Sequence, residues 1–505
     1  MLLLSNPEIR GASMLRSWDL KLQVSKSSGV VVYLQIAQQI SDEIQRGRLA
    51  PSTAMPGTRE LALKLNVNRK TVILAYEELI AQGWLTTENR RGTFVSDKLP
   101  HFSHSKNTKG ESKKQKIQSL EPAYEKYFLS DKKNDSAQII DFNDGIPDSR
   151  LIPFETLSKA FRHALIEPVR ANKLGYGDPK GNLRLREALS DMLNMERGLN
   201  SEVDNICITR GSQMGIFLAA RVLVSHNDYV VFEELSYPPA REAFRSCGAK
   251  ILSVGIDSDG IDVEELEALC KHHKIRAIYV TPHHQFPTTV MMTAERRMKL
   301  VMLAEQYDFV IVEDDYDHEF HFHNRPVFPL ASTGHADRII YVGSLSKVLA
   351  PGLRVGYLVA SKEVITACSS QVMLIDRQGN SITELAVAAL MESGEIRRHI
   401  RRTLKTYNER RNFLMELLQK ELGDFIQFDS PNGGLAIWLK LNEAIDIENF
   451  THKALENKVK VLPASLFSHT NKSINGIRLG FGSLNLKELE LGIVRLKNAF
   501  TNKNI

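Results

Sequence analysis

The chain has 505 residues, a length that predicts more than one domain and a body large enough to bury a core of its own. Its net charge of +5 is too small at this length to indicate nucleic-acid binding, unless the positive charge is concentrated in one region. The four cysteines include no Cys-x-x-Cys pair, which argues against a zinc finger or a disulfide framework and favours a reducing compartment. No stretch approaches the roughly 20 apolar residues of a membrane-spanning helix, so we expect a cytoplasmic protein without a membrane partner. Residues 1–13 show no pattern that would order them, which makes Met14 an alternative translation start to Met1.

Residues 97–137 separate two regions of regular pattern. Between Lys98 and Lys116, six lysines stand against one glutamate, and Ser, Asn, Gly and His fill the gaps. This composition is typical of a flexible linker, with a basic arm that touches DNA as the alternative. We therefore predict three segments: a first domain over 28–96, the linker over 97–137 and a second domain over 138–505.

Residues 31–95 predict three short helices followed by a β-hairpin. The apolar positions of the first and third helices repeat at helical spacing: Tyr33, Ile36, Ala37, Ile40 and Ile44, then Val72, Ala75, Tyr76, Leu79 and Ile80. A second helix is expected from about Thr58, and Asn68 is well placed to cap the third. The hairpin follows over 83–95, with a basic, glycine-containing turn at 89–92.

The polar face of the third helix carries the chemistry of this region. Arg69, Lys70 and Thr71 stand at its N-terminal end, where a recognition helix meets base edges and phosphates in the major groove of double-stranded DNA. The basic turn at 89–92 is placed as a wing would be. A helix-turn-helix pattern, a basic turn and a linker agree with one another, so this region predicts a DNA-binding domain.

Three motifs in this region, at 56–62, 67–72 and 91–95, resemble the winged helix-turn-helix domain of GntR-type regulators in order and spacing. They read Pro-Gly-Thr-Arg-Glu-Leu-Ala, Val-Asn-Arg-Lys-Thr-Val and Arg-Gly-Thr-Phe-Val. The resemblance implies that the DNA operator is contacted by residues of the second helix, the third helix and the wing: Arg59, Asn68, Arg69, Lys70, Thr71, Arg90, Arg91 and Gly92.

The second region predicts an α/β body around a mostly parallel sheet. Apolar, β-rich runs alternate there with helical stretches, and they occur at 205–209, 229–232, 277–281, 309–312, 339–342 and 355–359. In such sheets a ligand sits at the carboxyl ends of the strands. The residues that follow these runs are therefore candidates for ligand contacts.

The run at 339–342 leads into Gly343-Ser344-Leu345-Ser346-Lys347, and Arg354 follows soon after. A lysine beside the ligand crevice can form a Schiff base with an aldehyde cofactor, while hydroxyls and an arginine can hold the phosphate of that cofactor. The run at 309–312 ends in Glu313-Asp314-Asp315-Tyr316-Asp317. A carboxylate at a buried strand end needs a partner, and a protonated pyridine nitrogen supplies one. The loop Arg210-Gly211-Ser212-Gln213 then offers free helix amides to a phosphate.

Together these features resemble the fold type I pyridoxal 5'-phosphate (PLP) enzymes, the aminotransferases, over most of 138–505. The likeness is more specific to the MocR branch of GntR regulators, which pairs the two domains, and rests on 176–181, 284–287, 313–320, 398–402 and 478–481. It implies that Lys347 carries PLP, that Asp314 pairs with the ring nitrogen and that Tyr316 contacts the ring oxygen. The phosphate would be held by Gly211, Ser212, Gln213, Ser344, Ser346 and Arg354.

The resemblance assigns three further residues. Tyr237 stands where an aromatic ring commonly stacks on the cofactor, although a core tyrosine is the alternative. Tyr176 matches a residue that reaches the phosphate of the neighbouring subunit, which implies a homodimer. Arg478 matches the arginine that binds the α-carboxylate of an amino acid, a group that a guanidinium suits by bidentate bonding.

One position departs from the aminotransferase pattern. Phe286 precedes Pro287 where those enzymes carry an asparagine that hydrogen-bonds the ring oxygen, and phenylalanine cannot make that bond. We therefore predict a PLP-dependent, DNA-binding transcription regulator that senses an amino acid, an amine or PLP itself through aldimine chemistry on Lys347. The alternatives are an active PLP-dependent aminotransferase with an appended DNA-binding domain, and a DNA-binding protein whose body only dimerises.

A group of histidines superficially offers metal ligands: His318, His321 and His323, with His283 and His284. Their spacing in the sequence matches no familiar metal site, and they can simply flank a turn. We therefore predict that no metal is bound.

Overall fold

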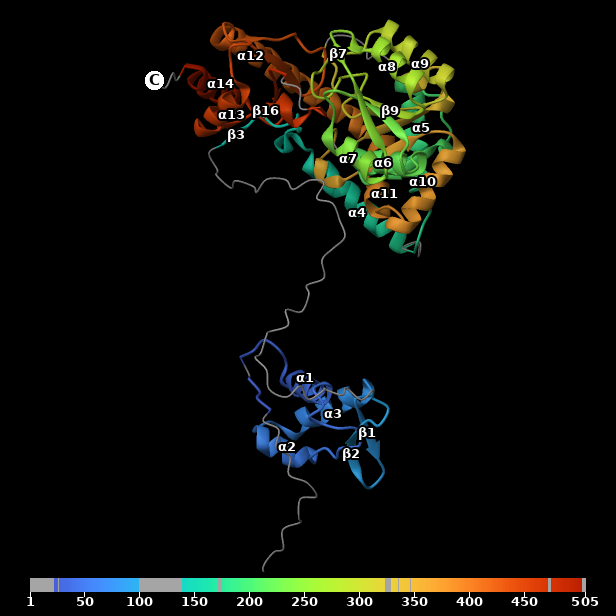
Figure 1. The fold of residues 1–505 in the computed structure, drawn as a ribbon, viewed down its shortest axis with the longest axis vertical. Helices are drawn as coiled ribbons and strands as arrows, with labels where there is room; N and C mark the ends of the chain where they lie inside the picture. Colours follow the sequence, from blue (N-terminus) through green and yellow to red (C-terminus); the bar gives the residue numbers. More distant parts are fainter. Residues whose placement is uncertain are drawn as a thin grey trace, which may run out of the picture. The chain divides into compact units, whose positions relative to one another are not determined.

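The chain divides into two compact units, Met1–Tyr124 and Glu125–Ile505, which are drawn in Figure 1. We call them the head and the body and treat each by itself. The computed structural model describes the following residues: 22–25, 27–99, 139–170, 175–322, 328–334, 336–345, 347–470 and 474–501. Met14 and most of the predicted linker lie outside them. None of the described helices is both long and apolar enough to cross a membrane.

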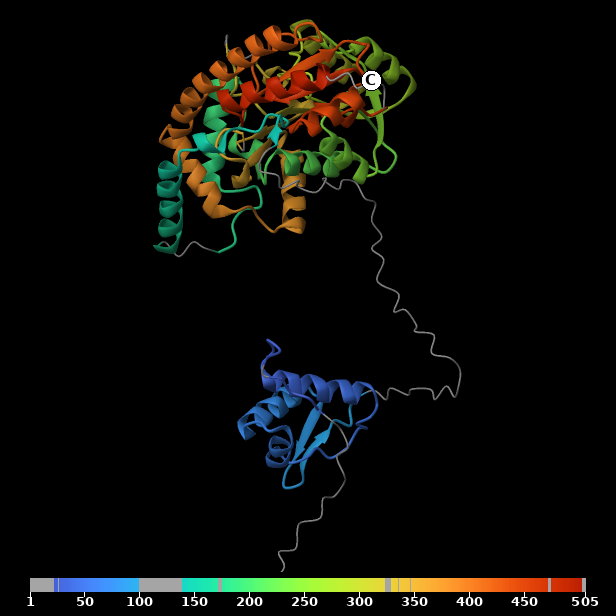
Figure 2. The same cartoon turned by 90° about the vertical axis from the view of Figure 1, so that its left-hand side faces the viewer.

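The head consists of three helices and a hairpin, as the sequence predicts. The elements are α1 (Val32–Gln45), α2 (Thr58–Leu65), α3 (Arg69–Ala81), β1 (Leu85–Glu88) and β2 (Gly92–Val95). Strands β1 and β2 pair antiparallel, and Figure 2 shows the hairpin beside the helices. The apolar faces of α1 and α3 meet in a small core with Leu85 and Val95. Helical spacing of the apolar residues therefore determines how this unit packs.

The turn between α2 and α3 follows from two asparagines. Asn66 ends α2 in the left-handed conformation, with a φ of 52°, which asparagine adopts more readily than most residues. Asn68 then caps α3, because its side-chain oxygen accepts a hydrogen bond from the backbone N–H of Lys70 at 2.9 Å. The predicted cap is confirmed, and it fixes the start of the helix that carries Arg69, Lys70 and Thr71.

The body is built on a seven-stranded sheet with the order β4-β12-β11-β10-β9-β5-β6. Only β12 runs antiparallel to its neighbours in this sheet, so the predicted, mostly parallel sheet is confirmed. The strands are β4 (Ile206–Thr209), β5 (Tyr229–Glu233), β6 (Lys250–Val254), β9 (Ile275–Val280), β10 (Val310–Asp315), β11 (Ile339–Ser344) and β12 (Gly356–Val359). The sequence did not reveal β6, an edge strand in which only Val254 is fully buried.

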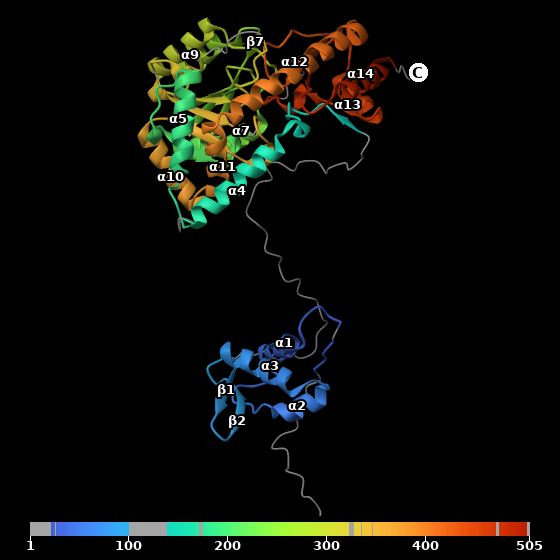
Figure 3. The same ribbon diagram turned by 180° about the vertical axis from the view of Figure 1, so that it is seen from behind.

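Helices cover both faces of this sheet (Figures 1 and 3). On one face α6 (Ser212–Leu223), α7 (Pro238–Ser246) and α10 (Lys362–Ile375) share an apolar core with the strands. The other core holds α4 (Phe154–Arg170), α5 (Leu183–Arg197), α8 (Val263–His272), α9 (Ala294–Tyr307) and α11 (Ser381–Glu392). Successive strand side chains alternate between the two cores, as burial on both faces of a sheet requires.

A second, smaller sheet with the order β13-β14-β17-β16 packs against the C-terminal helices. Its strands are β13 (Ile426–Gln427), β14 (Ala436–Leu441), β16 (Leu462–Pro463) and β17 (Gly476–Gly480), and its helices are α12 (Glu395–Leu422), α13 (Ile447–Glu456) and α14 (Leu486–Thr501). Figure 2 shows α12 to α14 in orange and red. Two short pairs complete the body: β3 (Ile140–Asp141) with β15 (Val459–Lys460), and β7 (Ile256–Asp257) with β8 (Gly260–Ile261). The four-stranded sheet carries Arg478, on β17.

Candidate functional site

Three of the predicted site residues of the body, Asp314, Ser344 and Lys347, lie at or just after the carboxyl ends of β10 and β11, and β9 runs beside β10. These strands are parallel neighbours, so the loops that follow them start at one edge of the sheet. Asp314 is the second-last residue of β10. Ser344 is the last residue of β11, and Lys347 follows three residues later. The topology therefore brings together residues that are more than 30 positions apart in the sequence.

Lys347 lies against the ring of Tyr316, with its Nζ atom 4.5 Å from the ring centroid. Burial lowers the pKa of this lysine, and the nearby Arg478 guanidinium lowers it further, against the opposing charges of Asp144, Asp317 and Asp314. A lower pKa leaves more of the amine in its neutral form, which is the form that attacks a carbonyl. The environment of Lys347 is therefore suited to a nucleophilic lysine.

Asp314 is a buried carboxylate with one satisfied and one unsatisfied oxygen. The Tyr279 hydroxyl donates to Oδ2 at 2.6 Å, while Oδ1 has no hydrogen-bond partner among the described residues. Burial raises the pKa of Asp314 to about 7, with a smaller contribution from the charge of Asp315 and opposition from the Tyr279 hydrogen bond. Burying an acceptor without a hydrogen bond destabilises the folded protein unless a donor pairs with it. A protonated ring nitrogen is such a donor.

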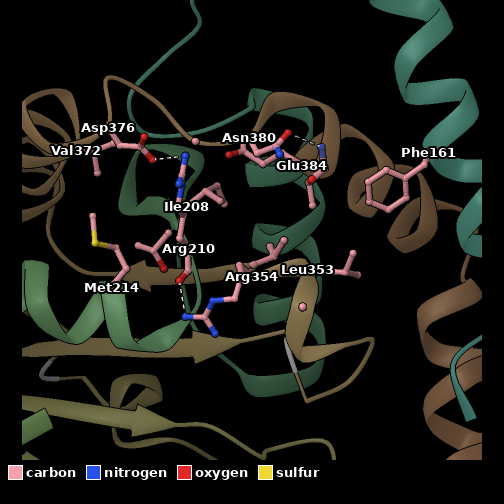
Figure 4. A pocket seen from close by; sticks show the side chains of 15 residues that line it. Phe161, Ile208, Arg210, Met214, Leu353, Arg354, Val372, Asp376, Asn380 and Glu384 are labelled. Carbon is pink, nitrogen blue, oxygen red and sulfur yellow. Dashed lines mark hydrogen bonds and ion pairs between the residues drawn. The ribbon is translucent and has the colours of Figure 1, made fainter. Parts of the chain in front are cut away.

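The start of α6 is a candidate anion-binding end. Gly211 precedes the helix with a φ of 79°, and Ser212 is its first residue. A Cβ atom at Gly211 would lie 2.8 Å from Nη2 of Arg354, so only glycine lets this guanidinium come so close to the helix. Nη2 of Arg354 donates to the Arg210 carbonyl at 2.9 Å (Figure 4). Free helix amides beside a guanidinium form a site for a phosphate group.

A cavity of about 310 Å³ opens beside Arg354 (Figure 4). Its lining includes Arg210, which forms an ion pair with Asp376 at 2.5 Å, but neither Lys347 nor Asp314. The cavity thus adjoins the anion-binding end and does not contain the lysine.

The remaining predicted phosphate ligands differ in how far the structure tests them. Ser344 is buried at the end of β11, in position for the predicted role. The Gln213 side chain instead donates to the Pro239 carbonyl at 3.0 Å. Ser346 lies outside the described residues. Phosphate binding by these three side chains stays a prediction.

Aromatic rings form one wall of the site. Tyr237 and Phe286 meet edge to face, with centroids 5.3 Å apart, and Phe286 contacts Tyr316 in the same way at 5.9 Å. The Tyr316 hydroxyl donates to the backbone carbonyl of His284 at 3.0 Å, so a bond to a cofactor oxygen would replace that one. Burial raises the pKa of the Tyr237 hydroxyl to about 12, with smaller contributions from the charges of Asp144 and Asp314 against that of Arg354.

Arg478 is the buried cation of the site, with 1% of its surface exposed. Its guanidinium donates to the backbone carbonyls of Asp144 and Pro287 and lies 4.6 Å from the centroid of the Phe286 ring. It forms no ion pair with any carboxylate that the structure describes. A buried charge without a counter-ion is a position that an anionic ligand group can complete.

Tyr176, the residue predicted to reach a second subunit, is exposed in the single chain. Its side chain has 79% of its surface exposed, and the Arg377 guanidinium lies 4.7 Å from the ring centroid. Contact with a partner subunit stays a prediction, and the exposed ring is compatible with it.

In the head, the predicted DNA-contacting residues lie on the surface. Arg59, Asn68, Arg69, Lys70, Arg90, Arg91 and Gly92 are exposed, and Thr71 is half-buried. Two of the arginines already have a protein partner: Arg69 donates to the Thr58 hydroxyl at 3.3 Å, and Arg91 forms an ion pair with Glu88 at 2.6 Å. The side chain of Asn68 is occupied as a helix cap. DNA contact by these residues stays a prediction.

The structure also gathers histidines that the sequence scatters. Ring nitrogens of His283, His318 and His321 all lie within 4.8 Å of one another, while His323 is outside the described residues. The neighbouring His284 is paired separately, with Nδ1 2.8 Å from Oδ1 of Asp317. The expectation that no metal is bound relied on sequence spacing, which does not reveal this proximity.

Comparison with known proteins identifies both units. Residues 137–496 match the family "Aminotransferase class I and II", and residues 32–95 match "Bacterial regulatory proteins, gntR family". The chain belongs to the class I and II aminotransferase family and carries a GntR-type head. The resemblance seen in the sequence is confirmed for both units.

Relatives of this aminotransferase-family chain share its two-part organisation. The chain is 28% identical over 480 residues to the probable rhizopine catabolism regulatory protein MocR of Rhizobium meliloti, covering 95% of this chain and 96% of that protein. It is also 28% identical to the pyridoxine biosynthesis transcriptional regulator PdxR of Corynebacterium glutamicum, covering 92% and 95%. Among solved structures, the kynurenine aminotransferase of Pyrococcus horikoshii, in complex with PMP, is 30% identical with a TM-score of 0.68, covering 73% of this chain and 92% of that one.

Two site residues of the aminotransferase-like body were missed in the sequence. Tyr279 pairs with Val312 across β9 and β10, and Asp314 lies on the same face two residues further along. Glu233, at the end of β5, is fully buried and accepts a hydrogen bond from Gln285 at 3.1 Å. The signal for Glu233 was present, because a glutamate that ends a buried apolar run resembles the pattern at Asp314.

Proposed function

We propose that the chain is a DNA-binding transcription regulator whose body holds PLP and uses it to sense a small amino compound. One observation carries this proposal: Lys347 and the half-satisfied, buried Asp314 occur in the same chain as a head with an exposed basic helix start. The relatives named MocR and PdxR support it, since their names describe regulators and their lengths are matched almost completely. Regulators of the GntR type bind DNA, so we propose a double-stranded DNA operator as the partner of the head. We also propose that the protein acts in the cytoplasm.

The residues present fit PLP. Oδ1 of Asp314 lacks a donor that a protonated pyridine nitrogen would supply, and the cradle between Gly211 and Arg354 has room that a Cβ atom would fill. Asp314 would hold the ring, and the α6 amides, Ser212 and Arg354 would hold the phosphate. When bound, PLP supplies an electrophilic aldehyde, with which amines react, on an electron-withdrawing ring. Lys347, whose pKa is lowered by burial, would supply the amine for that aldehyde.

The remaining side chains define what else can enter. Arg478 can offer its guanidinium to a carboxylate, since its hydrogen bonds go to backbone carbonyls and it forms no ion pair with a carboxylate of the described residues. The Tyr316 and Phe286 rings contact each other and lie against Lys347 and Arg478, respectively, so the site is apolar on that side. This arrangement favours an amino acid over an amine that lacks a carboxylate, because only the former neutralises Arg478. PLP itself as the sensed compound is the other outcome.

Regulation requires that the ligand favour one arrangement of the protein over another. We infer a homodimer, with the exposed Tyr176 reaching the phosphate site of the second subunit. Ligand binding at Arg478 and Lys347 would then change the arrangement of the two bodies, and with it the affinity of the heads for an operator with two half-sites.

The test records two responses of the full-length protein at once. Amino acids and amines are screened for a change in the visible absorbance of the PLP-loaded protein and in its affinity for its own upstream DNA. We expect one compound to change both, and Lys347→Ala to lose both responses while it keeps basal, salt-sensitive DNA binding. Lys487→Ala, at an exposed lysine of α14, is the matched control. A Lys347→Ala protein that still responds fully to the compound would exclude the proposed role of this lysine.

A second candidate function is an active aminotransferase. The specific observation in its favour is that Lys347, Asp314 and Arg478 are all present in one site of an aminotransferase-family body. Phe286 speaks against it, because the side chain cannot donate the hydrogen bond that steadies the cofactor oxygen. Steady transfer of amino groups to a 2-oxo acid over many turnovers would favour the enzyme, whereas a single stoichiometric reaction favours the regulator.

A further inference from the structure

Three histidines converge where the loops after β9 and β10 begin. His283 comes three residues after β9, and His318 and His321 follow the end of β10. Because β9 and β10 are parallel neighbours, their loops leave the sheet side by side. The backbone of His321 also bridges to Gly433, which ties its loop to the smaller sheet layer. The fold thus holds the three rings together at one edge of the body.

The spacing of the rings is close to that of a coordination sphere. One nitrogen from each of the three rings lies within 4.8 Å of the others, and the Nε2 atoms of His283 and His321 are 3.0 Å apart. Zinc–nitrogen bonds of about 2.0–2.1 Å in a tetrahedron place ligand nitrogens about 3.4 Å apart. Small side-chain rotations would therefore convert the present arrangement into three bonds to one ion.

The surrounding groups orient the rings as ligands. Oδ2 of Asp315 lies 2.8 Å from Nδ1 of His318 and also accepts from the Tyr341 hydroxyl at 2.6 Å, which leaves Nε2 of His318 for an ion. A carboxylate on the far nitrogen of a histidine is the usual support of a metal ligand. His283 is 2% exposed, and its Nδ1 atom has no hydrogen-bond partner among the described residues. The buried ring of His283 is therefore incompletely satisfied by the protein.

We propose that His283, His318 and His321 bind a transition-metal ion, which the ligand set identifies as Zn²⁺ or a divalent ion of similar preference. Imidazole nitrogen suits zinc, copper, nickel and iron, whereas magnesium and calcium require oxygen ligands. Three protein ligands leave a fourth position for water or for an atom of an incoming ligand. This inference goes beyond the proposed function and does not depend on PLP binding.

The ion would join two loops that each contribute to the site. The loop after β9 carries Phe286 and Pro287, and the loop after β10 carries Tyr316, whose hydroxyl already donates to the backbone of His284. Fixing these loops to each other would fix the wall that contacts Lys347 and Arg478. We therefore expect metal binding to raise the thermal stability of the body.

The test uses the tag-free, full-length protein, stripped with a chelator and freed of unbound PLP, which is itself a chelator. Zn²⁺ is titrated against a chromophoric competitor, and Co²⁺ is added separately to the same protein. We expect one equivalent of tight binding per chain and the strong visible absorption of tetrahedral cobalt. Because the loss of a supporting group alone costs about 10–100-fold in metal affinity, His321→Asn, which removes a ligand, should cost about 100-fold or more.

His452→Asn is the matched control, since His452 is an exposed histidine on α13 and should bind metal like the parent protein. Equal affinity of the parent and His321→Asn would overturn the proposal, as would the absence of a saturable first equivalent. If His321→Asn does not fold, the cobalt spectrum of the parent decides: tetrahedral bands support the site, and their absence refutes it.

Discussion

The head and the body place their functional side chains in opposite environments. In the head, Arg59, Lys70 and Arg90 are exposed, so water satisfies their charges when DNA is absent. In the body, Glu233, Asp314 and Arg478 are almost fully buried, and both carboxylates retain an oxygen without a partner among the described residues. The head is thus a complete structure without its ligand, whereas the body buries polar groups that the described residues leave incompletely paired.

The difference follows from what each unit is suited to bind. A surface that neutralises phosphates can keep its charges hydrated until DNA displaces ions and water. A pocket that surrounds a small molecule must present its polar groups already in place, and it bears the cost of burying them. Changes in the body should therefore alter stability or ligand affinity strongly, while changes in the head should have small effects that depend on salt.

The largest expected effect concerns Glu233. Its Oε1 atom has no partner among the described residues, and burial raises its pKa to about 8, against the weaker effect of hydrogen bonds from Gln285 and the Thr281 backbone. An acid with a raised pKa binds its proton more tightly in the folded state, so the folded protein loses stability as pH rises from about 4.5 to 8. Glu233→Gln removes this titration and should stabilise the protein on the order of 3 kcal/mol at pH 7.

Thermal unfolding of Glu233→Gln and the parent at several pH values measures this effect. The advantage of the variant should grow from pH 5 to pH 8, because the unfolded parent ionises Glu233 over that range while the folded parent keeps the buried carboxyl protonated. Glu443→Gln, at an exposed glutamate, should show no such trend. A pH-independent difference between Glu233→Gln and the parent would contradict the view that the body buries polar groups at a cost.

The second prediction tests whether a ligand completes the body. Asp314→Asn keeps the shape of the side chain but removes the negative charge that would meet a protonated ring nitrogen. Hydrogen bonds to charged groups contribute about 2 kcal/mol, so PLP affinity should fall about 30-fold. Absorbance titration with PLP measures the affinity, and Asp424→Asn, at an exposed aspartate, should leave it unchanged. If Asp314→Asn bound PLP as tightly as the parent protein, Asp314 would not contact the cofactor ring.

The sequence predicted the parts of both units that local patterns specify. Helical spacing predicted the helices of the head, and apolar runs predicted the strands that lead to Asp314 and Lys347, because each signal lies within about ten residues. The hydrogen bond between Tyr279 and Asp314 was not predictable, since it depends on the register of β9 against β10. The proximity of His283 to His321 depends on the same register. Strands as short as β13 and β16, two residues each, carry no periodic signal at all.

The third prediction separates folding from recognition at Asn68 of the head. Its side chain caps α3, so Asn68→Ala should destabilise the head by about 1 kcal/mol, whereas Asn68→Ser should retain the cap. Calorimetry of the full-length protein records the transition of the head, and DNA binding is measured on the same samples. If Asn68 also contacts DNA, the serine variant will be as stable as the parent but will bind DNA more weakly. If the parent and Asn68→Ser bound DNA equally well, Asn68 would act only as a helix cap.

The smallest expected effect lies in the wing, at Glu88. The ion pair of Arg91 with Glu88 joins two exposed side chains at 2.6 Å, and such pairs contribute less than about 1 kcal/mol. Glu88→Gln should release the Arg91 guanidinium for a phosphate and remove a negative charge from the wing. We expect a gain in DNA affinity of a few-fold, roughly 0.5–1 kcal/mol, and a dependence on salt that steepens by about 0.9 in logarithmic slope if Arg91 gains a full phosphate contact.

Binding of the upstream DNA at several salt concentrations measures both quantities, with Glu155→Gln, an exposed glutamate of the body, as the control for net charge. If Glu88→Gln and the control have the same effect, the wing does not approach the phosphates and Arg91 leaves the DNA-contacting set. If only Glu88→Gln steepens the slope, the head depends on exposed charges whose protein partners are weak enough for DNA to replace, in contrast to the buried groups of the body.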